Sequence, residues 1–150
     1  MNPSDSADRP RNPECIFCKI AAGEIPSYKV YEDDDVLAFL DVGPLCDGHT
    51  LVIPKAHYAT LDEMPGELVA ACTRMMPQLG KAIQQATGAG AWNLLQNNGR
   101  LAHQEVGHVH FHLIPKTENA GLGITWPSQE LSRDVAGELQ QKIAGQMDQG

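Results

Sequence analysis

The sequence predicts an α+β fold in which two main helices cover a five-stranded antiparallel sheet. Three observations lead to this prediction. Short apolar runs bounded by Gly, Pro and Asp follow one another along the chain, which favours strands that pair with their neighbours in sequence. Residues 64–86 repeat their apolar positions with a helical period. Residues 108–114 alternate histidine with apolar residues, as a half-buried strand does.

Four elements are expected before residue 60, in this order: a helix at 15–22 and strands at 27–31, 36–40 and 49–53. The helix ends at Gly23, a residue type that favours helix C-termini. The acidic residues 32–35 join the first two strands. They can be read as a cation site, but a solvated hairpin turn explains them better. Pro54 stops the third strand.

The rest of the chain supplies two strands and both main helices, in this order: a helix at 64–86, strands at 92–96 and 107–114, and a weakly amphipathic helix at 129–147. Pro77 lies inside the first of these helices and is expected to kink or split it. The neighbouring pair Met75 and Met76 fits core packing better than a cofactor site. A polar loop, 97–105, joins the two strands. The chain contains neither an internal repeat nor a clear domain linker.

Composition excludes several classes of function. The 150 residues are 42% hydrophobic and fit one domain, 14–150, behind a disordered polar tail, 1–13. A net charge of −8 argues against a basic surface that binds nucleic acid. No apolar run reaches the ~20 residues of a membrane span, and the tail lacks the apolar core of a signal peptide. We therefore expect a cytoplasmic protein whose four cysteines bind metal or stay free thiols.

Three of the six histidines stand two residues apart, at positions 108, 110 and 112. In a strand, side chains at this spacing share one face and lie about 6.6–6.8 Å apart. Val109, Phe111 and Leu113 would then enter the core on the other face. Imidazole titrates near neutral pH and can act as base, nucleophile or metal ligand. A run of solvated histidines would not need these apolar partners, so the strand is the candidate functional element.

The segment Cys15-Ile16-Phe17-Cys18 is a Cys-x-x-Cys pair. Such a pair can be one half of a zinc site, or it can be two buried thiols at the start of a helix. Two histidines offer the other half of a site: His57, which follows the third strand, and His108. Together with the cysteines they would form a closed Cys₂His₂ structural site.

Several of these segments together resemble the histidine triad (HIT) family. The family signature, His-apolar-His-apolar-His-apolar-apolar, is found here at 108–114. The other matching segments are Cys15 to Ile20, Gly23-Glu24-Ile25-Pro26, Val36 to Asp41, Gly48 to Lys55, Asn97-Asn98-Gly99 and His103 to Val106. The match covers about 15–126 and is most similar to the Hint-like branch of purine nucleoside phosphoramidases.

The resemblance implies a HIT-like fold whose five-stranded sheet pairs with that of a second copy, giving a ten-stranded sheet in a homodimer. An exposed sheet edge is normally covered or paired. The contact would be two-fold and made by helix 64–86 and the strand from Trp92. The segment 122–126, with a Trp that would be exposed in a lone protomer, would cross toward the partner's active site and shape the leaving-group pocket.

The resemblance also implies a mechanism. His110 would attack the α-phosphorus of an adenosine 5′-phosphoramidate or a related AMP ester or anhydride, and water would then release AMP from a nucleotidyl-histidine. His112 would assist the leaving group, while His49 and His108 complete the catalytic set. The purine nucleotide would contact Phe17, Ile20, Asp41, Val42, Asn97, Gln104, Glu105, His110 and His112. Catalysis would need no metal, so zinc at Cys15, Cys18, His57 and His108 would be structural.

Three positions, His103, Glu105 and Gly107, depart from the residues common in the family. A carboxylate beside a phosphate is repulsive, so Glu105 is expected to contribute its backbone N–H. Asp41 can accept both ribose hydroxyls, or it can simply end a strand. Two other functions stay open: Fhit-like hydrolysis of dinucleoside polyphosphates, and a zinc-stabilised nucleotide-binding scaffold. The Cys-x-x-Cys segment and the residues 121–126 favour the phosphoramidase.

Overall fold

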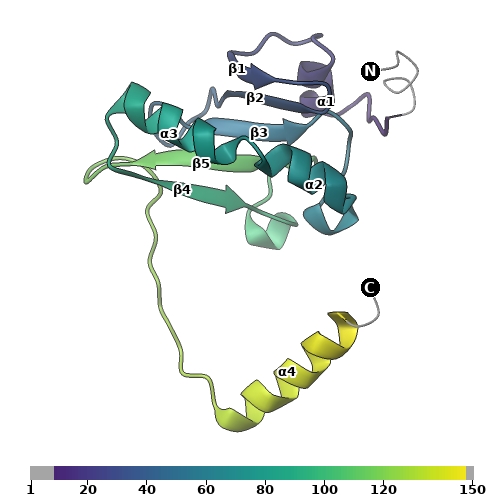
Figure 1. Ribbon diagram of the computed structural model, residues 1–150, viewed down its shortest axis with the longest axis vertical. Coiled ribbons are helices and arrows are strands. Elements are labelled where there is room, and N and C mark those ends of the chain that lie inside the picture. The colour runs from purple at the N-terminus through teal and green to yellow at the C-terminus, as the bar shows by residue number, and fades with distance from the viewer. Residues whose placement is uncertain (1–8, 148–150) are drawn as a thin grey trace.

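The computed structural model describes residues 9–147. Within them, a five-stranded antiparallel sheet has the order β1-β2-β3-β5-β4 (Figure 1). The strands are β1 (Lys29–Glu32), β2 (Val36–Leu40), β3 (Thr50–Pro54), β4 (Ala91–Gln96) and β5 (Phe111–Lys116). The helices are α1 (Ile16–Ala21), α2 (Gly66–Thr73), α3 (Met76–Thr87) and α4 (Arg133–Met147), with 3₁₀ turns η1 (Leu61–Glu63) and η2 (Arg100–Ala102). The predicted α+β sheet is confirmed.

The strand prediction differs most at β5. The strand was expected at 107–114 and is found at Phe111–Lys116. The backbone before it belongs to a loop contact, because the N–H of Val109 donates to the carbonyl of Tyr58 at 2.8 Å. The alternation of faces nevertheless continues through this segment: Val109, Phe111 and Leu113 are all buried in one apolar cluster. The predicted alternation of the two faces is therefore present, although the strand itself is shorter than predicted.

The predicted helix 64–86 is split into two. Helix α2 ends at Thr73 and α3 begins at Met76. Pro77 lies in the first turn of α3, where its missing N–H would have had no partner within the helix. Pro77 therefore starts a helix rather than kinking one.

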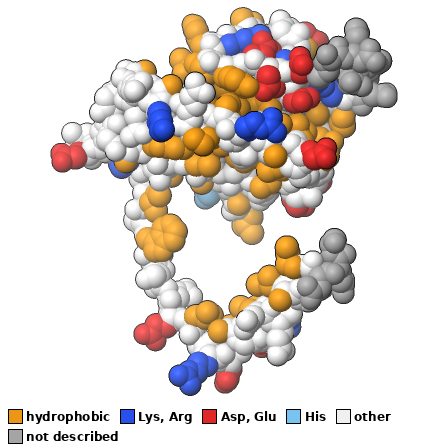
Figure 2. Space-filling model, viewed as in Figure 1, with side chains coloured by type: hydrophobic (Ala, Val, Ile, Leu, Met, Phe, Trp, Pro, Cys, Tyr) orange, Lys and Arg blue, Asp and Glu red, His pale blue; other side chains and the backbone are white. Residues whose placement is uncertain are grey.

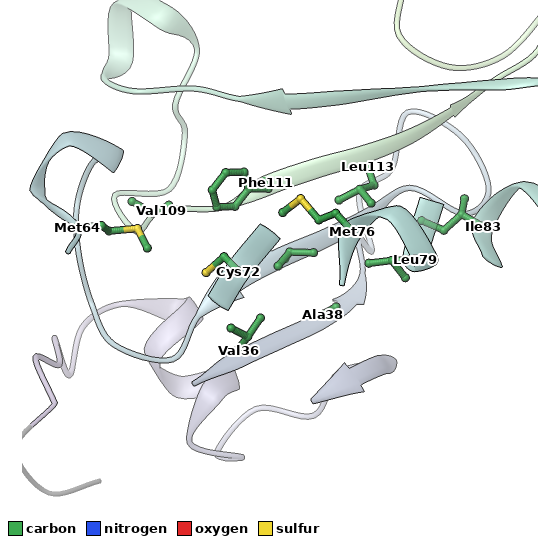
Figure 3. Packing of buried hydrophobic residues seen from close by; sticks show 11 residues of the cluster. Val36, Ala38, Met64, Cys72, Met76, Leu79, Ile83, Val109, Phe111 and Leu113 are labelled. Carbon is green, nitrogen blue, oxygen red and sulfur yellow. The ribbon is translucent and has the colours of Figure 1, made fainter. Parts of the chain in front are cut away.

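Two apolar clusters lie on the two faces of the sheet. Helices α2 and α3 cover the first face, and Figure 3 shows their side chains meeting those of the strands. Helix α1 covers part of the second face, where Phe17 and Ile20 pack on residues of β2 and β3. Gly80 allows α3 to approach β4 closely, because a Cβ at this position would lie 2.4 Å from the ring of Trp92.

The last helix lies apart from the body of the molecule. An extended segment, 117–132, leads away from β5 to α4, whose described residues include no buried side chain (Figure 1). Ser132 caps α4 by accepting from the N–H of Val135, so the helix begins at Arg133 and not at the predicted residue 129. Hydrophobic side chains line both the linking segment and the helix (Figure 2). Trp126, at 82% exposed, is as open as expected for a lone protomer.

Part of the predicted N-terminal tail lies outside the described residues, namely 1–8. The described part contacts the body: the carbonyl of Pro10 accepts from the N–H of His57 at 2.7 Å, and Arg11 pairs with Glu24. Residues 9–13 are thus fixed beside the Cys-x-x-Cys segment, since their backbone and charged groups find partners there. None of the helices in 9–147 combines the length and apolar character that a membrane crossing needs.

Candidate active site and metal centre

A cavity of about 340 Å³ opens on the face of the sheet opposite α2 and α3. It lies where the end of β2, the start of β3, and strands β4 and β5 meet. Its lining residues are Asp41, Gly43, Leu45, His49, Leu95, Asn97, His103, Glu105, His110, His112 and Ile114. The cavity thus collects imidazoles, carboxylates and an amide from four separate stretches of the chain.

His110 is buried, and its two ring nitrogens have different roles. Nδ1 lies 2.8 Å from the carbonyl oxygen of His108, which can only accept, so Nδ1 carries the proton. Nε2 is then the atom with a free lone pair. Burial lowers the pKa of His110, although the His108 carbonyl and the charges of Asp41 and Glu105 act in the opposite direction. The ring of Phe17 meets His110 edge to face at 5.1 Å and limits its rotation. His110 is therefore a neutral, oriented imidazole suited to nucleophilic attack.

A chain of hydrogen bonds orients His112. The backbone N–H of Leu45 donates to Nδ1 of His49 at 3.1 Å, so a neutral His49 carries its proton on Nε2. That Nε2 lies 2.9 Å from Nδ1 of His112 and donates to it. Neutral His112 must then hold its own proton on Nε2, from which it can donate a hydrogen bond to a ligand. Burial and the neighbouring His110 and His49 lower the pKa of His112 to about 4, so it is neutral at pH 7.

Asp41 lies beside this chain. Its Oδ1 accepts from the N–H of Gly43 at 2.8 Å, and its Oδ2 lies 3.7 Å from Nε2 of His49. Burial lowers the pKa of His49 despite this carboxylate. Asp41, His49 and His112 are close enough together to hold a metal ion. The two facing histidine nitrogens already share one proton in a hydrogen bond, however, so the group is better explained as part of the hydrogen-bond chain.

The loop between β4 and β5 is held by Gln104. This side chain is buried; its Oε1 accepts from the N–H of Gly99 at 2.7 Å, and its Nε2 donates to the carbonyls of Ala59 and Val106. Asn97 donates from Nδ2 to the carbonyl of His103 at 3.4 Å. The side chain of Gln104 therefore serves the loop, which leaves only its backbone for the contact with the phosphate that the resemblance implies.

A second group of donors lies beyond His110, on the side of α1. His108 is fully buried, and its Nε2–H donates to the carbonyl of Pro54 at 2.8 Å, which leaves Nδ1 as a lone pair. That Nδ1 lies 3.1 Å from Nδ1 of His57, 3.4 Å from Sγ of Cys15 and 3.6 Å from Sγ of Cys18. Burial lowers the pKa of His108 to about 4. All four donor atoms fall within 4.8 Å of one another.

These distances fit a tetrahedral zinc ion. Bonds of about 2.3 Å to sulfur and about 2.0 Å to nitrogen require separations of roughly 3.6 Å between S and N and roughly 3.3 Å between two N atoms. Sγ of Cys18 lies 3.4 Å from Nδ1 of His57, in line with this geometry. All four cysteines of the chain are free, so Cys15 and Cys18 form no disulfide. The predicted metal-ligating residues are thus brought together with their donor atoms converging.

The structure places the other predicted site residues in three ways. Six line the cavity: Asp41, His49, Asn97, Glu105, His110 and His112. Phe17 touches His110 from α1, whereas Ile20 packs in the apolar cluster beside it and Val42 is 83% exposed outside the lining. The ring of His108, predicted to be catalytic as well as metal-ligating, points to the cysteines, and only its carbonyl serves His110.

Sequence reasoning missed several lining residues. Ile114 could have been found, because it lies two residues after His112 on the same strand face. Leu95 faces the cavity because β4 pairs it with His112, a register that the sequence does not reveal. The role of the Leu45 backbone N–H also needs the folded loop.

The chain is similar to several known proteins. A family model described as the HIT domain matches residues 22–119. The chain is 46% identical over 135 residues to adenosine 5′-monophosphoramidase HNT1 of Saccharomyces cerevisiae, covering 89% of this chain and 83% of that protein. The solved structure of SMU.412c from Streptococcus mutans superposes with a TM-score of 0.87 at 41% identity, covering 91% and 87% of the two chains.

A zinc-bound histidine triad family protein from Mycobacterium smegmatis is also similar, with a TM-score of 0.67 at 32% identity over 91% of this chain and 96% of that chain. The family model covers more than half of the residues, and it spans the residues that line the cavity as well as His57 and His108, whereas Cys15 and Cys18 lie before the matched range. The chain belongs to the HIT family.

Proposed function

We propose that the protein is a nucleotide hydrolase that cleaves adenosine 5′-phosphoramidates, and related AMP esters and anhydrides, through a nucleotidyl-histidine on His110. The observation that carries this proposal is the ring of His110, whose Nδ1–H is held by the His108 carbonyl while Nε2 keeps its lone pair. The similar yeast protein is named an adenosine 5′-monophosphoramidase, which supports the substrate class.

The reaction follows from the tautomers. Nε2 of His110 attacks phosphorus and the P–N bond breaks; the leaving nitrogen takes a proton from solvent and departs as the amine, while Nε2–H of neutral His112 donates a hydrogen bond to the reacting group. Water then attacks the same phosphorus and loses a proton to solvent, the P–Nε2 bond breaks, and AMP is released. His112 stays neutral throughout. Asp41 would bind the ribose hydroxyls, and Asn97 and the backbone at Gln104 and Glu105 would face the phosphate.

We infer further that Cys15, Cys18, His57 and His108 hold a structural zinc ion. Four convergent donors with tetrahedral spacing and a buried lone pair on His108 support this inference. When bound, the ion would tie the N-terminal segment to the chain that precedes β5. The proposed reaction steps at His110 do not involve this ion.

A homodimer is also part of this proposal. Strand β4 is an unpaired sheet edge among the described residues, and its Leu94 is 50% exposed. Trp126 and the apolar side chains of α4 need cover that the protomer does not supply. Light scattering at micromolar concentration should give twice the mass of one chain, and a monomer would contradict the dimer. Truncation before Gly121 should change leaving-group preference more than nucleotide affinity.

The test of the function is AMP release from adenosine 5′-phosphoramidate by wild type and by His110→Ala. Wild type should turn over, and the variant should still bind AMP without turnover. Trapping and mapping the covalent adduct should locate it on His110. Preferred hydrolysis of a dinucleoside polyphosphate would favour the Fhit-like alternative, and nucleotide binding without turnover would favour a scaffold.

A further inference from the structure

The charges around the cavity do not match a phosphate anion by itself. The lining includes two carboxylates, Asp41 and Glu105, and no lysine or arginine. Burial lowers the pKa of His110 and of His112, so neither supplies a full positive charge at neutral pH. A carboxylate about 6 Å from a phosphate oxygen repels it. A substrate that also carries a positive charge would therefore match this site better than one that brings only negative charge.

We propose that Glu105 selects phosphoramidate substrates whose leaving amine carries a positive charge. The carboxylate would pair with a cationic group on the departing amine, such as a second, protonated amine a few bonds from the P–N bond. This inference rests on the proposed phosphoramidase function and names the substrate class within it. Glu105 is then a specificity-determining residue, and the bond-breaking steps stay those of His110 and His112.

The sheet register separates the two carboxylates. Asp41 directly follows β2, beside the C-terminal half of β5, whereas the β4–β5 loop that carries Glu105 enters at the N-terminal end of β5. The two histidines at 110 and 112 lie between them along the strand. A nucleotide whose ribose is bound at Asp41 and whose phosphorus lies at the histidines would direct its leaving group toward Glu105.

Glu105 is held on a fixed support. The preceding residue, Gln104, anchors the loop to Gly99, Ala59 and Val106 with three hydrogen bonds of 2.7–3.0 Å. Gln104 is buried, and the neighbouring Glu105 lines the cavity. A charge on a fixed loop discriminates between ligands better than one on a mobile side chain that can turn away.

The carboxylate of Glu105 is free to meet a ligand. Within residues 9–147 it forms neither a hydrogen bond nor an ion pair that would occupy it, whereas the structural carboxylate of Glu32 is paired with Lys55 at 2.9 Å. The charge of Glu105 also reaches the reacting group, since it acts to raise the pKa of His110. It is thus an unpaired charge at the edge of the reaction site.

The test compares two substrates of equal size: the adenosine 5′-phosphoramidates of 2-aminoethylamine, which carries an ammonium group, and of 2-hydroxyethylamine, which does not. Wild type should favour the ammonium substrate about tenfold in kcat/KM at low salt, and added salt should reduce this ratio. Glu105→Gln should bring the ratio to within about twofold of one. Glu118→Gln, at an exposed carboxylate outside the cavity, is the matched control and should keep the wild-type ratio.

The outcomes separate the two proposals. Equal rates for both substrates in wild type, or an equal loss for both in Glu105→Gln, would overturn the role of Glu105 and leave the phosphoramidase intact. Failure of wild type to hydrolyse either substrate would overturn the proposed function together with this inference. Reversing the charge at this position is a further test. The Glu105→Lys variant should prefer the N-carboxymethyl phosphoramidate, whose leaving amine carries a carboxylate, over the ammonium substrate.

Discussion

His108 and His110 stand two residues apart on one face of the same segment, yet they present opposite nitrogens. His108 donates from Nε2 to the carbonyl of Pro54 and keeps the lone pair on Nδ1, which meets the cysteines. His110 donates from Nδ1 to the carbonyl of His108 and keeps the lone pair on Nε2. One imidazole is thereby prepared for a metal ion and the other for phosphorus. The carbonyl that each ring meets makes the difference.

The metal group and the surroundings of His110 are also in direct contact. His108, a proposed ligand of the metal group, supplies the carbonyl that orients the proposed nucleophile. Phe17, which lies between the two cysteines, meets His108 at 5.8 Å and His110 at 5.1 Å between ring centres. A change confined to the metal group should therefore lower stability more than turnover. A change confined to the group around His110 should lower turnover more than stability.

The largest effect is expected from His110→Ala. Turnover should fall by about 10³-fold or more, because the atom that would form the proposed covalent intermediate is lost. Metal content should stay as in wild type, since the ring of residue 110 is not among the ligands. Steady-state AMP release and elemental analysis of the same preparation measure both. An adduct mapped to His108 or His112 in wild type would contradict the assignment.

Cys18→Ser should produce the reverse pattern. Loss of a ligand from a buried metal group should remove the bound zinc and lower the free energy of unfolding by roughly 3 kcal/mol, about 10 °C in Tm for a chain of this size. Differential scanning calorimetry with metal analysis makes the measurement. Cys46→Ser is the matched control, because Cys46 lies outside the group and donates only to the carbonyl of Pro115. Metal-free wild type of full stability would refute the zinc inference.

A smaller effect is expected at His49. His49→Ala removes the donor that holds Nδ1 of His112, so kcat should fall about 10- to 100-fold because the Nε2–H of His112 is no longer oriented toward the reacting group. His49→Gln keeps an N–H near the same place and should recover part of the rate. Metal content and Tm should change little in His49→Gln. If both variants matched wild type in kcat, the hydrogen-bond chain would have no role in turnover.

The smallest effect concerns stability against pH. The pKa of His112 is about 4 in the folded protein and near 6.5 in the unfolded chain, so the unfolded chain binds the extra proton first. Stability should therefore fall as pH drops from about 6.5 to about 4, and it should be insensitive to His112 above that window. Urea midpoints for wild type and His112→Gln test this, with the variant showing the shallower decline. Equal slopes would argue against a buried, neutral His112.

Much of the fold could be predicted because it rests on local patterns. The alternation at 108–113 was enough to place Val109, Phe111 and Leu113 in the core. Pro77 was enough to locate a break in the helical segment, although only packing decided that α3 starts beside it. The predicted first residue of α4 was wrong. The side chain of Ser132 accepts from a first-turn N–H and caps the helix, and an apolar pattern does not reveal a cap.

The candidate site was less predictable than the fold. Residues joined by strand spacing, such as His110 and His112, were found together in the cavity. Val42 and the backbone of Gln104 were assigned to the nucleotide by resemblance; Val42 lies outside the cavity lining, and the side chain of Gln104 forms its hydrogen bonds within its own loop and to Ala59. Whether a polar side chain faces a ligand or its own backbone depends on carbonyls brought near it by folding.

The sequence by itself determined which residues could do chemistry here: a strand face of imidazoles and a Cys-x-x-Cys segment with two further histidines. It did so because strand geometry repeats every two residues and needs no distant partner. Only the tertiary structure decided what each imidazole can do. Pro54 and Leu45 come from other stretches of the chain, and their backbone groups place the proton on one ring nitrogen and leave the other free. A neutral imidazole has one donor and one acceptor, so its surroundings determine its role.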